Sequence, residues 1–519
     1  MIVENQSEVV AFLSRPDTYA EAGIEPRPVE RIDTHASVLF LVGDQVYKLK
    51  RAVRFPYLDY STCERRRRFC EAEVEVNCRT APDLYRGVIP IVRRSNGGLA
   101  LGGEGEIVDW VVKLRRFDQE ALFDRLAAAG RLDRFAMESL ADAIARFHDS
   151  AERRPADGGA DGVARVLDGN RTCFESADAA ILDPAKARRL VDASQRAFVR
   201  LAPLLDHRRD EGFVRHCHGD LHLRNIVVHN GHAVLFDAIE FDPSFAAIDV
   251  LYDLAFLVMD LHFCGYPLLA SIVLNRYLDN TGDGSGDVSG LAALPLFLSM
   301  RAAIRSHIEA LAAASQSSAG QADERARSAR RYLDLAFDVL AEPHPCLIAV
   351  GGLSGSGKSR LARELAPRLG PAPGARVVRT DSTRKRLAGV ALGTRLGTHD
   401  YSEAMGRRTY EAVFDEARRA LAAGCPVIAD AVFARPEERA AIAEVARLAG
   451  VAFHGIWLNA ASGLLEQRVA GRRNNVSDAT PEVVRLQLAY DLGDIDWWRL
   501  DSSGDATQTL DAACAWLGM

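Results

Sequence analysis

The sequence predicts two domains, a mixed α+β domain followed by an α/β domain with a parallel sheet. The chain has 519 residues, and a domain commonly holds about 100–200 residues, so more than one domain is expected. Strands gather near the start and apolar helices follow them, whereas strands and helices alternate after Glu342-Pro343-His344-Pro345. Alternation is typical of parallel sheets, and the two prolines disfavour a continuing helix. We therefore expect domains at residues 1–341 and 342–519.

Composition and charge indicate an ordinary globular protein. Hydrophobic residues make up 48% and charged residues 26% of the chain, which excludes wholesale disorder. A net charge of −7 provides no overall basic surface and argues against nucleic acid as a partner. No apolar run is long enough to span a bilayer, and the first residues do not resemble a secretory signal. Nine scattered cysteines without a CxxC pair suggest reduced thiols, so we expect a cytoplasmic protein with no membrane partner.

The first half is predicted to begin with strands and to continue with helices. Gly43-Asp44 and Asn230-Gly231 each separate two apolar runs, which is a hairpin signal. Two segments rich in Gly and Asp, Pro155–Gly162 and Thr281–Gly290, are predicted as loops, and Ser315–Ala326 is either a linker or a charged helix. The expected strands are Val29–Thr34, Val38–Val42, Gln45–Lys50, Ile107–Arg115, Ile226–Val228 and Ala233–Phe236. The expected helices are Glu64–Asn77, Gln119–Ala129, Arg134–Arg146, Pro184–Leu205, Ile248–Asp260, Leu268–Leu278 and Leu291–Ala314.

A short segment of the first half carries the residue types that phosphoryl transfer needs. Residues 218–225 read HGDLHLRN, and the Asp-x-x-x-x-Asn spacing suits a catalytic loop. In that role Asp220 accepts the proton of an acceptor hydroxyl, and Asn225 binds Mg²⁺. Asp237 directly follows a predicted strand, where the same arrangement places a second metal-binding carboxylate. Each residue alone has structural explanations, so the prediction rests on their order.

A kinase of this type also needs a lysine for the ATP phosphates and a helical carboxylate to hold it. Lys48 and Lys50 lie on one face of the third predicted strand. We prefer Lys48, because Val46-Tyr47-Lys48 aligns better with the V-A-I-K pattern, and we keep Lys50 as the alternative. The carboxylate comes from the next helix, where Glu71, Glu73 and Glu75 are candidates and Glu73 is preferred.

These segments resemble the aminoglycoside phosphotransferase and choline-kinase-like superfamily. The resemblance is carried by HGDLHLRN, by LFDAIEFD and by Asp249 in IDVLYDLA, and it covers approximately Val29–Ala314. It implies a protein-kinase-like fold. The loop Thr34–Ser37 lacks the G-x-G-x-x-G of protein kinases, as it commonly does in this superfamily.

A phosphate-binding loop opens the second half. GLSGSGKS fits GxxxxGK[ST] between a predicted strand, Leu347–Val350, and a predicted helix, Ser359–Leu369. Backbone N–H groups of such a loop surround phosphates, its lysine reaches the β- and γ-phosphates, and its serine hydroxyl binds Mg²⁺. A glycine-rich turn without a ligand is the alternative. The predicted ATP-binding residues are Gly352, Leu353, Ser354, Gly355, Ser356, Gly357, Lys358 and Ser359.

Charged residues follow the next predicted strands. Asp381 ends the strand Val377–Thr380 at the sheet edge that faces ligands, where it is a candidate base, although Asp is also a favoured helix N-cap. Arg384 is a candidate for binding an anionic substrate group. Asp430 ends the strand Pro426–Ala429 at a Walker B position near Mg²⁺. Helically spaced arginines predict a mobile segment that closes over the transferring phosphoryl group. The alternative interpretation is an exposed basic face of a helix. The arginines are Arg468, Arg472 and Arg473.

The second half resembles the zeta-toxin and chloramphenicol-phosphotransferase branch of small P-loop kinases. The resemblance is carried by the P-loop, TDSTRKRLAG, DAVFARPEER and RVAGRRNNVSDAT, and it spans most of Cys346–Met519. It implies Asp381 as catalytic base, Arg384 at the substrate and the arginine segment as a lid. The order of the two halves resembles a bacterial fused family described as aminoglycoside phosphotransferase/ATP-binding protein.

The sequence thus predicts two ATP- and Mg²⁺-dependent kinase domains that act on hydroxyl groups of small molecules. The alternatives are one catalytic half beside a nucleotide-sensing half, a non-catalytic regulator that binds ATP, and a kinase acting on RNA or protein. The presence of Asp220 and Asp381 argues against a pure sensor, which needs no base. Neither acceptor is identified by the sequence.

Overall fold

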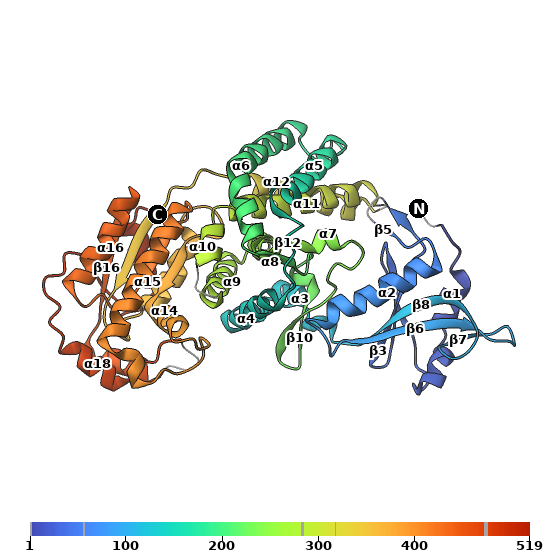
Figure 1. Ribbon diagram of the computed structural model, residues 1–519, viewed down its shortest axis with the longest axis horizontal. Helices are drawn as coiled ribbons and strands as arrows, with labels where there is room; N and C mark the ends of the chain where they lie inside the picture. The colour runs from blue at the N-terminus through green and yellow to red at the C-terminus, as the bar shows by residue number, and fades with distance from the viewer. Residues whose placement is uncertain (1–2, 56–57, 282–284, 317, 472–475) are drawn as a thin grey trace. The chain divides into compact units, whose positions relative to one another are not determined.

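The computed structural model describes residues 3–55, 58–281, 285–316, 318–471 and 476–519 (Figure 1). The chain divides into two compact units. Unit 1 comprises residues 1–132, 150–158 and 213–253, and unit 2 comprises residues 133–149, 159–212 and 254–519. None of the described helices has the length and apolar character needed to cross a membrane.

Unit 1 is built on an antiparallel sheet with the strand order β1-β2-β3-β8-β6-β7. Its strands alternate between two packed faces, as a period of two requires. On one face Phe40 and Val111 pack with Phe12 of α1 (Ser7–Leu13). On the other, Leu41 packs with Cys70 of α2. Its strands are β1 (Glu30–Asp33), β2 (Ser37–Val42), β3 (Gln45–Lys50), β6 (Tyr85–Arg93), β7 (Leu99–Leu101) and β8 (Glu106–Arg115).

Helix α2 (Cys63–Cys78) is the long helix of unit 1, and Thr62 caps it by accepting a hydrogen bond from the Arg65 N–H. Such a cap satisfies a donor that would otherwise be unpaired at the helix start. Shorter elements complete the unit: η1 (Pro16–Ala22), β4 (Arg54–Phe55), β5 (Leu58–Asp59), η2 (Gln119–Ala121), α3 (Phe123–Ala128), β9 (Val214–His216), η3 (Leu223–Asn225), β10 (Ile226–His229), β11 (His232–Leu235), α7 (Pro243–Ala246) and β12 (Ala247–Asp249). The hairpin predicted at Asn230-Gly231 joins β10 to β11.

Unit 2 contains a group of helices followed by the second sheet. Two of these helices are joined by an ion pair, in which Arg276 of α9 donates to both carboxylate oxygens of Asp142 of α4 at 2.6 and 2.8 Å. The helices are α4 (Arg134–Ser150), α5 (Gly159–Glu175), α6 (Pro184–Asp210), α8 (Val250–Phe263, whose first turn belongs to unit 1), α9 (Pro267–Asn280), α10 (Ser285–Gly290), α11 (Leu294–Ala314) and α12 (Ala319–Asp338).

Two loop predictions are wrong in part, because distant residues stabilise helices there. Helix α5 begins at Gly159, inside the predicted loop Pro155–Gly162, where the Asp206 carboxylate accepts a hydrogen bond from Ala160 N at 3.0 Å. Helix α10 lies inside the predicted loop Thr281–Gly290, with Val288 fully buried. Of the two alternatives for Ser315–Ala326, the charged helix is the one observed, as the start of α12.

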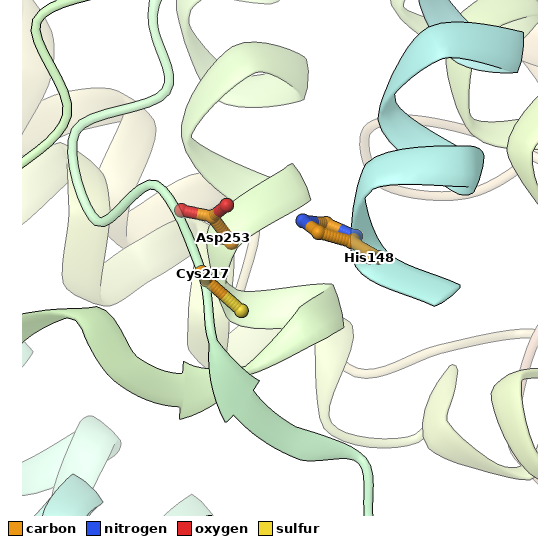
Figure 2. Close-up of side chains that lie close together, drawn as sticks. All are labelled: His148, Cys217 and Asp253. Carbon is orange, nitrogen blue, oxygen red and sulfur yellow. The ribbon is translucent and has the colours of Figure 1, made fainter. Parts of the chain in front are cut away.

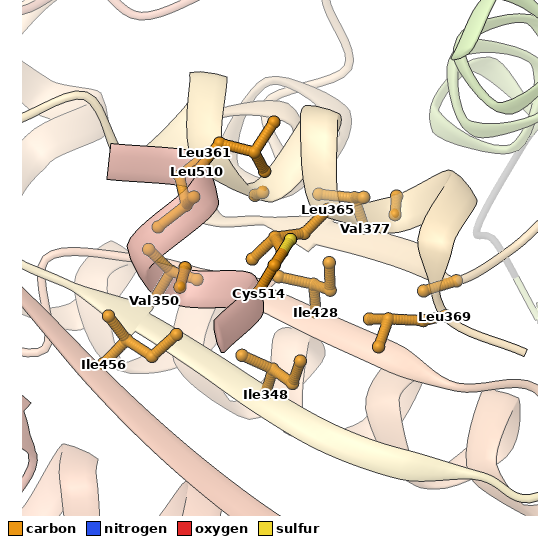
Figure 3. Packing of buried hydrophobic residues seen from close by; sticks show 14 of the residues in the cluster. Ile348, Val350, Leu361, Leu365, Leu369, Val377, Ile428, Ile456, Leu510 and Cys514 are labelled. Carbon is orange, nitrogen blue, oxygen red and sulfur yellow. The ribbon is translucent and has the colours of Figure 1, made fainter. Parts of the chain in front are cut away.

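The second sheet is parallel, with the strand order β14-β15-β13-β16-β17, which confirms the predicted α/β architecture. Figure 3 shows its buried core, in which Val350 and Ile428 of adjacent strands pack with Leu361 and Leu365 of α13 and with Leu510 of α19. The strands are β13 (Cys346–Gly351), β14 (Arg376–Arg379), β15 (Val427–Asp430), β16 (Ala452–Asn459) and β17 (Trp498–Asp501). The helices are α13 (Lys358–Leu365), η4 (Ala366–Arg368), α14 (Thr380–Leu387), η5 (Thr398–Tyr401), α15 (Glu403–Ala422), α16 (Pro436–Ala449), α17 (Ser462–Ala470), α18 (Pro481–Leu488) and α19 (Ala506–Trp516).

Candidate functional sites

Strand β3 presents two lysines to one buried carboxylate of α2. Lys48 Nζ lies 2.8 Å from Glu73 Oε1, and Lys50 Nζ lies 2.6 Å from Glu73 Oε2. Burial raises the pKa of a carboxyl group, but here Lys48 and Lys50 outweigh burial and hold the pKa of Glu73 below its ordinary value. Glu71 and Glu75 are exposed. Of the three candidate glutamates, Glu73 is thus the one that contacts the lysines.

The two lysines differ in their other partners. Lys48 Nζ lies 2.8 Å from Asp237 Oδ1, whereas Lys50 Nζ lies 2.5 Å from Glu240 Oε1. The Tyr60 hydroxyl also donates to Glu240 Oε1, at 2.6 Å. Burial opposes the charge of Lys48, but Asp237 and Glu73 raise its pKa well above the ordinary value. Neither Glu240 nor Tyr60 was predicted to take part in this network. The one feature of the sequence that could have predicted the contact of Glu240 with the lysines was its position, three residues after Asp237.

The Asp-x-x-x-x-Asn segment forms a closed turn. Asn225 Nδ2 donates to Asp220 Oδ2 and to the Asp220 carbonyl, both at 2.9 Å. His222 Nε2 lies 3.3 Å from Asp220 Oδ2. Asn225 is buried, whereas the Asp220 side chain is 40% exposed. The turn therefore fixes the carboxylate while leaving it accessible to an acceptor.

A buried carboxylate from α8 holds the start of this turn. Asp253 accepts hydrogen bonds from His218 N at 3.1 Å and from Gly219 N at 2.9 Å, and Figure 2 shows its carboxylate beside the backbone that carries Cys217. Gly219 has a φ of +83°, and a Cβ there would lie 2.9 Å from Ile239 Cδ1. The left-handed backbone and the crowding both favour glycine at this position.

His218 connects the turn to the strand end that precedes Asp237. Its Nε2 lies 2.9 Å from the Phe236 carbonyl, and burial lowers the pKa of His218, which favours the neutral ring. Asp237 itself has a φ of +59°, a conformation that is uncommon for residues other than glycine and that often marks functional positions. Asp220, Asn225, His218, Asp237 and Lys48 thus belong to one connected group within unit 1.

The P-loop lies between β13 and α13, as predicted. A Cβ on Gly352 would lie 2.6 Å from the Leu458 carbonyl oxygen, and a Cβ on Gly355 would lie 2.5 Å from that of Leu465. Both glycines also have positive φ, at +133° and +90°. The loop can therefore follow this path only with glycine at these positions. Lys358 Nζ donates to the Leu353 carbonyl at 2.9 Å.

A cavity of about 1460 Å³ adjoins this loop within unit 2. Its wall includes residues 354–359 together with the four other predicted residues Asp381, Arg384, Asp430 and Arg468. Gly352 and Leu353 belong to the loop but not to this wall. Arg472 and Arg473 lie outside the described residues. The structure thus brings together predicted residues from four separate segments.

Asp381 and Arg384 share the short helix α14. The N-cap position is Arg379, so Asp381 lies in the first helical turn and is not the cap. Arg384 donates to the Asp400 carbonyl at 3.2 Å, and its guanidinium lies 5.0 Å from the ring centroid of Tyr401. Asp430 is 4% exposed at the end of β15, where it accepts a hydrogen bond from Arg379 at 3.3 Å.

Other polar groups of this cavity were not predicted. Asp478 lies 3.3 Å from Lys385 Nζ and accepts a hydrogen bond from the Tyr401 hydroxyl at 3.1 Å. Burial and the Asp478 carboxylate raise the pKa of Tyr401. Gln487 of α18 accepts a hydrogen bond from Ser354 N at 2.8 Å. These contacts join segments that are far apart in the sequence, so no spacing could have revealed them.

Two family models match the chain. Residues 104–286 match the model described as phosphotransferase enzyme family, and residues 347–490 match the model described as AAA domain. Together with the two folds, these matches place the protein among the phosphotransferases of the kinase class. More particularly, it is a fusion in which a phosphotransferase-family domain precedes a P-loop kinase domain, as the sequence predicted.

The chain is similar along its length to an uncharacterized protein of Mycobacterium tuberculosis, Rv2004c. The two are 29% identical over 491 residues, which cover 93% of this chain and 94% of the relative. A choline/ethanolamine kinase family protein from Mesorhizobium loti is similar to 63% of this chain and over 98% of its own length, at 13% identity and a TM-score of 0.38. A gluconokinase from Sinorhizobium meliloti is similar to 34% of this chain and over 93% of its own length, at 19% identity and a TM-score of 0.25.

Proposed function

We propose that each half transfers the γ-phosphoryl group of ATP to a hydroxyl group of a small molecule, with the halves divided at residues 1–341 and 342–519. One observation supports this most. Each half has its own lysine suited to phosphates, Lys48 or Lys358, and its own accessible carboxylate suited to a base, Asp220 or Asp381. A module that only sensed nucleotide would need the lysine alone.

In the first half, Lys48 binds the α- and β-phosphates and Glu73 orients it. Asp220 accepts the proton of the acceptor hydroxyl, whose oxygen forms a bond to the γ-phosphorus while the bond from that phosphorus to the β,γ-bridging oxygen breaks. ADP leaves with the bridging oxygen. Asn225 holds the Asp220 carboxylate in place through its amide, so that positioning supplies much of the rate.

In the second half, the N–H groups of residues 352–359 and the Lys358 ammonium bind the phosphates. Asp381 accepts the proton of the acceptor hydroxyl. The hydroxyl oxygen bonds to the γ-phosphorus while the bond from that phosphorus to the β,γ-bridging oxygen breaks, and ADP leaves. Arg384 binds the acceptor, and Arg468 lies on the cavity wall where it can neutralise charge on the transferring group.

The oxygen donors that the two sites offer fit Mg²⁺, which prefers carboxylate, carbonyl and hydroxyl oxygens. The residues that would hold it are Asn225 and Asp237 in the first half and Ser359 and Asp430 in the second. The Asp237 side chain is 45% exposed beside Lys48, so its second oxygen is accessible. Bound Mg²⁺ would neutralise charge on the β- and γ-phosphates.

Labelled ATP and a fraction of small metabolites test the proposal. Wild type should yield two sets of labelled products, of which Asp220→Asn loses one and Asp381→Asn loses the other. Each variant serves as the control for the other, because each changes a single carboxylate. A variant that retains every product would show that its half is not catalytic, and label on RNA or protein instead would contradict the acceptor class.

A further inference from the structure

Three arginines from three different elements line the wall of the unit 2 cavity. Arg363 lies on α13, one turn beyond the Ser359 hydroxyl, and Arg379 ends β14. Arg134 is the first residue of α4 and lies within residues 104–286, which match the phosphotransferase family. All three line the same cavity as the P-loop.

Buried contacts hold the helix that carries Arg134 against the P-loop domain. Arg376 at the start of β14 is buried and donates to Asp279 of α9 at 2.6 Å and to Glu416 of α15 at 2.7 Å. Asn275 of α9 accepts a hydrogen bond from Val377 N at 2.7 Å. Helix α9 is in turn joined to α4 by the Arg276–Asp142 ion pair. Within unit 2, Arg134 is therefore held at the cavity by a continuous set of contacts.

The charges of the three arginines are unevenly compensated. Arg134 pairs with Glu138 at 2.6 Å, and Arg379 pairs with Asp430 at 3.3 Å. Arg363 forms no hydrogen bond or ion pair with any residue that the structure describes. The neighbouring Glu364 is itself paired, with Arg360 at 2.8 Å.

The environment of Arg363 disfavours its charge. Burial, and after it the charges of Arg134 and Arg379, lower the pKa of Arg363 to about 10, against weaker opposing effects of Glu364 and Glu138. An anion placed among the three guanidiniums would relieve both the repulsion and the lost solvation. Arginine also suits phosphate and carboxylate groups geometrically, because its N–H donors form a planar fork.

We propose that Arg134, Arg363 and Arg379 bind an anionic group, a phosphate or a carboxylate, on the acceptor of the P-loop half. The acceptor is then an anionic alcohol, and residues of the phosphotransferase-family segment complete its binding site. The inference rests on the proposed function of the P-loop half. It also gives a reason for the fusion, since the P-loop domain without Arg134 would bind its acceptor more weakly.

Calorimetry on the full chain tests this with inorganic phosphate as the probe. Each sample is first titrated to saturation with AMP-PNP and Mg²⁺, so that the P-loop and the first site are filled before phosphate is added. Wild type should then show a saturable phosphate site, and glycerol, a neutral alcohol, should show none. Arg134→Ala and Arg363→Ala should each weaken phosphate binding by about tenfold or more, while Arg134→Lys should restore part of the affinity.

Arg146→Ala is the matched control, because Arg146 is an exposed arginine on the same helix α4, and it should bind phosphate as wild type does. If Arg363→Ala does not fold, the test rests on Arg134→Ala. The Arg134 side chain is 27% exposed, so its replacement should leave the chain folded. Absence of a saturable phosphate site in wild type, or unchanged affinity in Arg134→Ala, would overturn the inference and leave the proposed function intact. Failure of the nucleotide titration to fill the P-loop would instead overturn the proposed function, and this inference with it.

Discussion

The two candidate sites hold their proposed phosphate-binding lysines in different ways. In unit 1, Lys48 is paired with carboxylates from two distant segments, Glu73 of α2 and Asp237 after β11. In unit 2, Lys358 donates to the carbonyl of Leu353, five residues earlier in its own loop, and glycines fix that loop. The first site depends on buried charges assembled by tertiary folding, whereas the second is built mostly from consecutive backbone. Substitutions at the first site should therefore affect stability as well as ligand binding.

The largest effect should follow loss of the P-loop lysine. Lys358→Ala removes the ammonium that we propose to bind the β- and γ-phosphates, so calorimetry with an ATP analogue should report one nucleotide site in the variant and two in wild type. Lys186→Ala is the control, because Lys186 is a surface lysine paired with Asp334, and it should retain both sites. Loss of both sites in Lys358→Ala would contradict the independence of the two halves.

A second, smaller effect is expected from loss of Arg468, which should act on the rate of phosphoryl transfer. Arg468→Ala should lower ADP formation by the P-loop half on the order of 10³-fold, because a guanidinium at the transferring phosphoryl group stabilises charge that develops in the transition state. The assay uses an Asp220→Asn background to silence the first half. Arg485→Ala on the adjacent helix α18 is the control, since Arg485 is exposed and pairs with Glu466 and Glu482. Equal turnover in Arg468→Ala and Arg485→Ala would leave Arg468 as part of a solvated helix face.

The same difference between the sites explains what the sequence could predict. The P-loop was recognisable because eight consecutive residues specify it, with a strand before and a helix after. The Asp220–Asn225 turn is also a run of consecutive residues, but its interpretation depended on the order of the lysine, the glutamate and the three Asp and Asn residues along the chain. Only the P-loop prediction could rest on local chain geometry alone.

Contacts between distant segments were not predictable from spacing. Lys48 and Lys50 lie on the same face of a strand, so the sequence could not decide which of them binds phosphate. The structure shows that Lys48 contacts Asp237, whereas Lys50 contacts Glu240. Arg134 lies more than 200 residues before the P-loop and was seen only as the start of a helix. Helix α5 was not predicted, and its start lies in a segment predicted as a loop, because the Ala160 N–H near its start is satisfied by Asp206 of another helix.

A third prediction concerns the buried charges of the first site. Glu73→Gln leaves Lys48 and Lys50 buried with one carboxylate fewer, and removing one partner of a buried pair typically costs about 3–5 kcal/mol. Because the pKa of Glu73 is lowered on folding, its contribution is present above the ordinary carboxyl pKa and is lost as the pH falls toward the folded value. Denaturant unfolding should show a large gap between wild type and Glu73→Gln at pH 7 and a smaller gap at pH 3.5. An equal gap at both pH values would show that the carboxylate charge is not the stabilising feature.

The smallest effect should come from the other two glutamates of α2. Glu71 forms an i,i+4 pair with Arg67 in which both side chains are about half exposed, and Glu75 is exposed as well. Exposed pairs contribute little, because solvent screens them and ordering the side chains costs entropy. Glu71→Gln and Glu75→Gln should therefore leave the denaturation midpoint and the phosphoryl transfer of the first half indistinguishable from wild type. They are matched to Glu73→Gln in residue type, helix and chemical change, so burial beside the lysines is the remaining difference. A loss of transfer in Glu71→Gln as large as that in Glu73→Gln would mean that the carboxylate acting on the phosphate lysine is on the other face of α2.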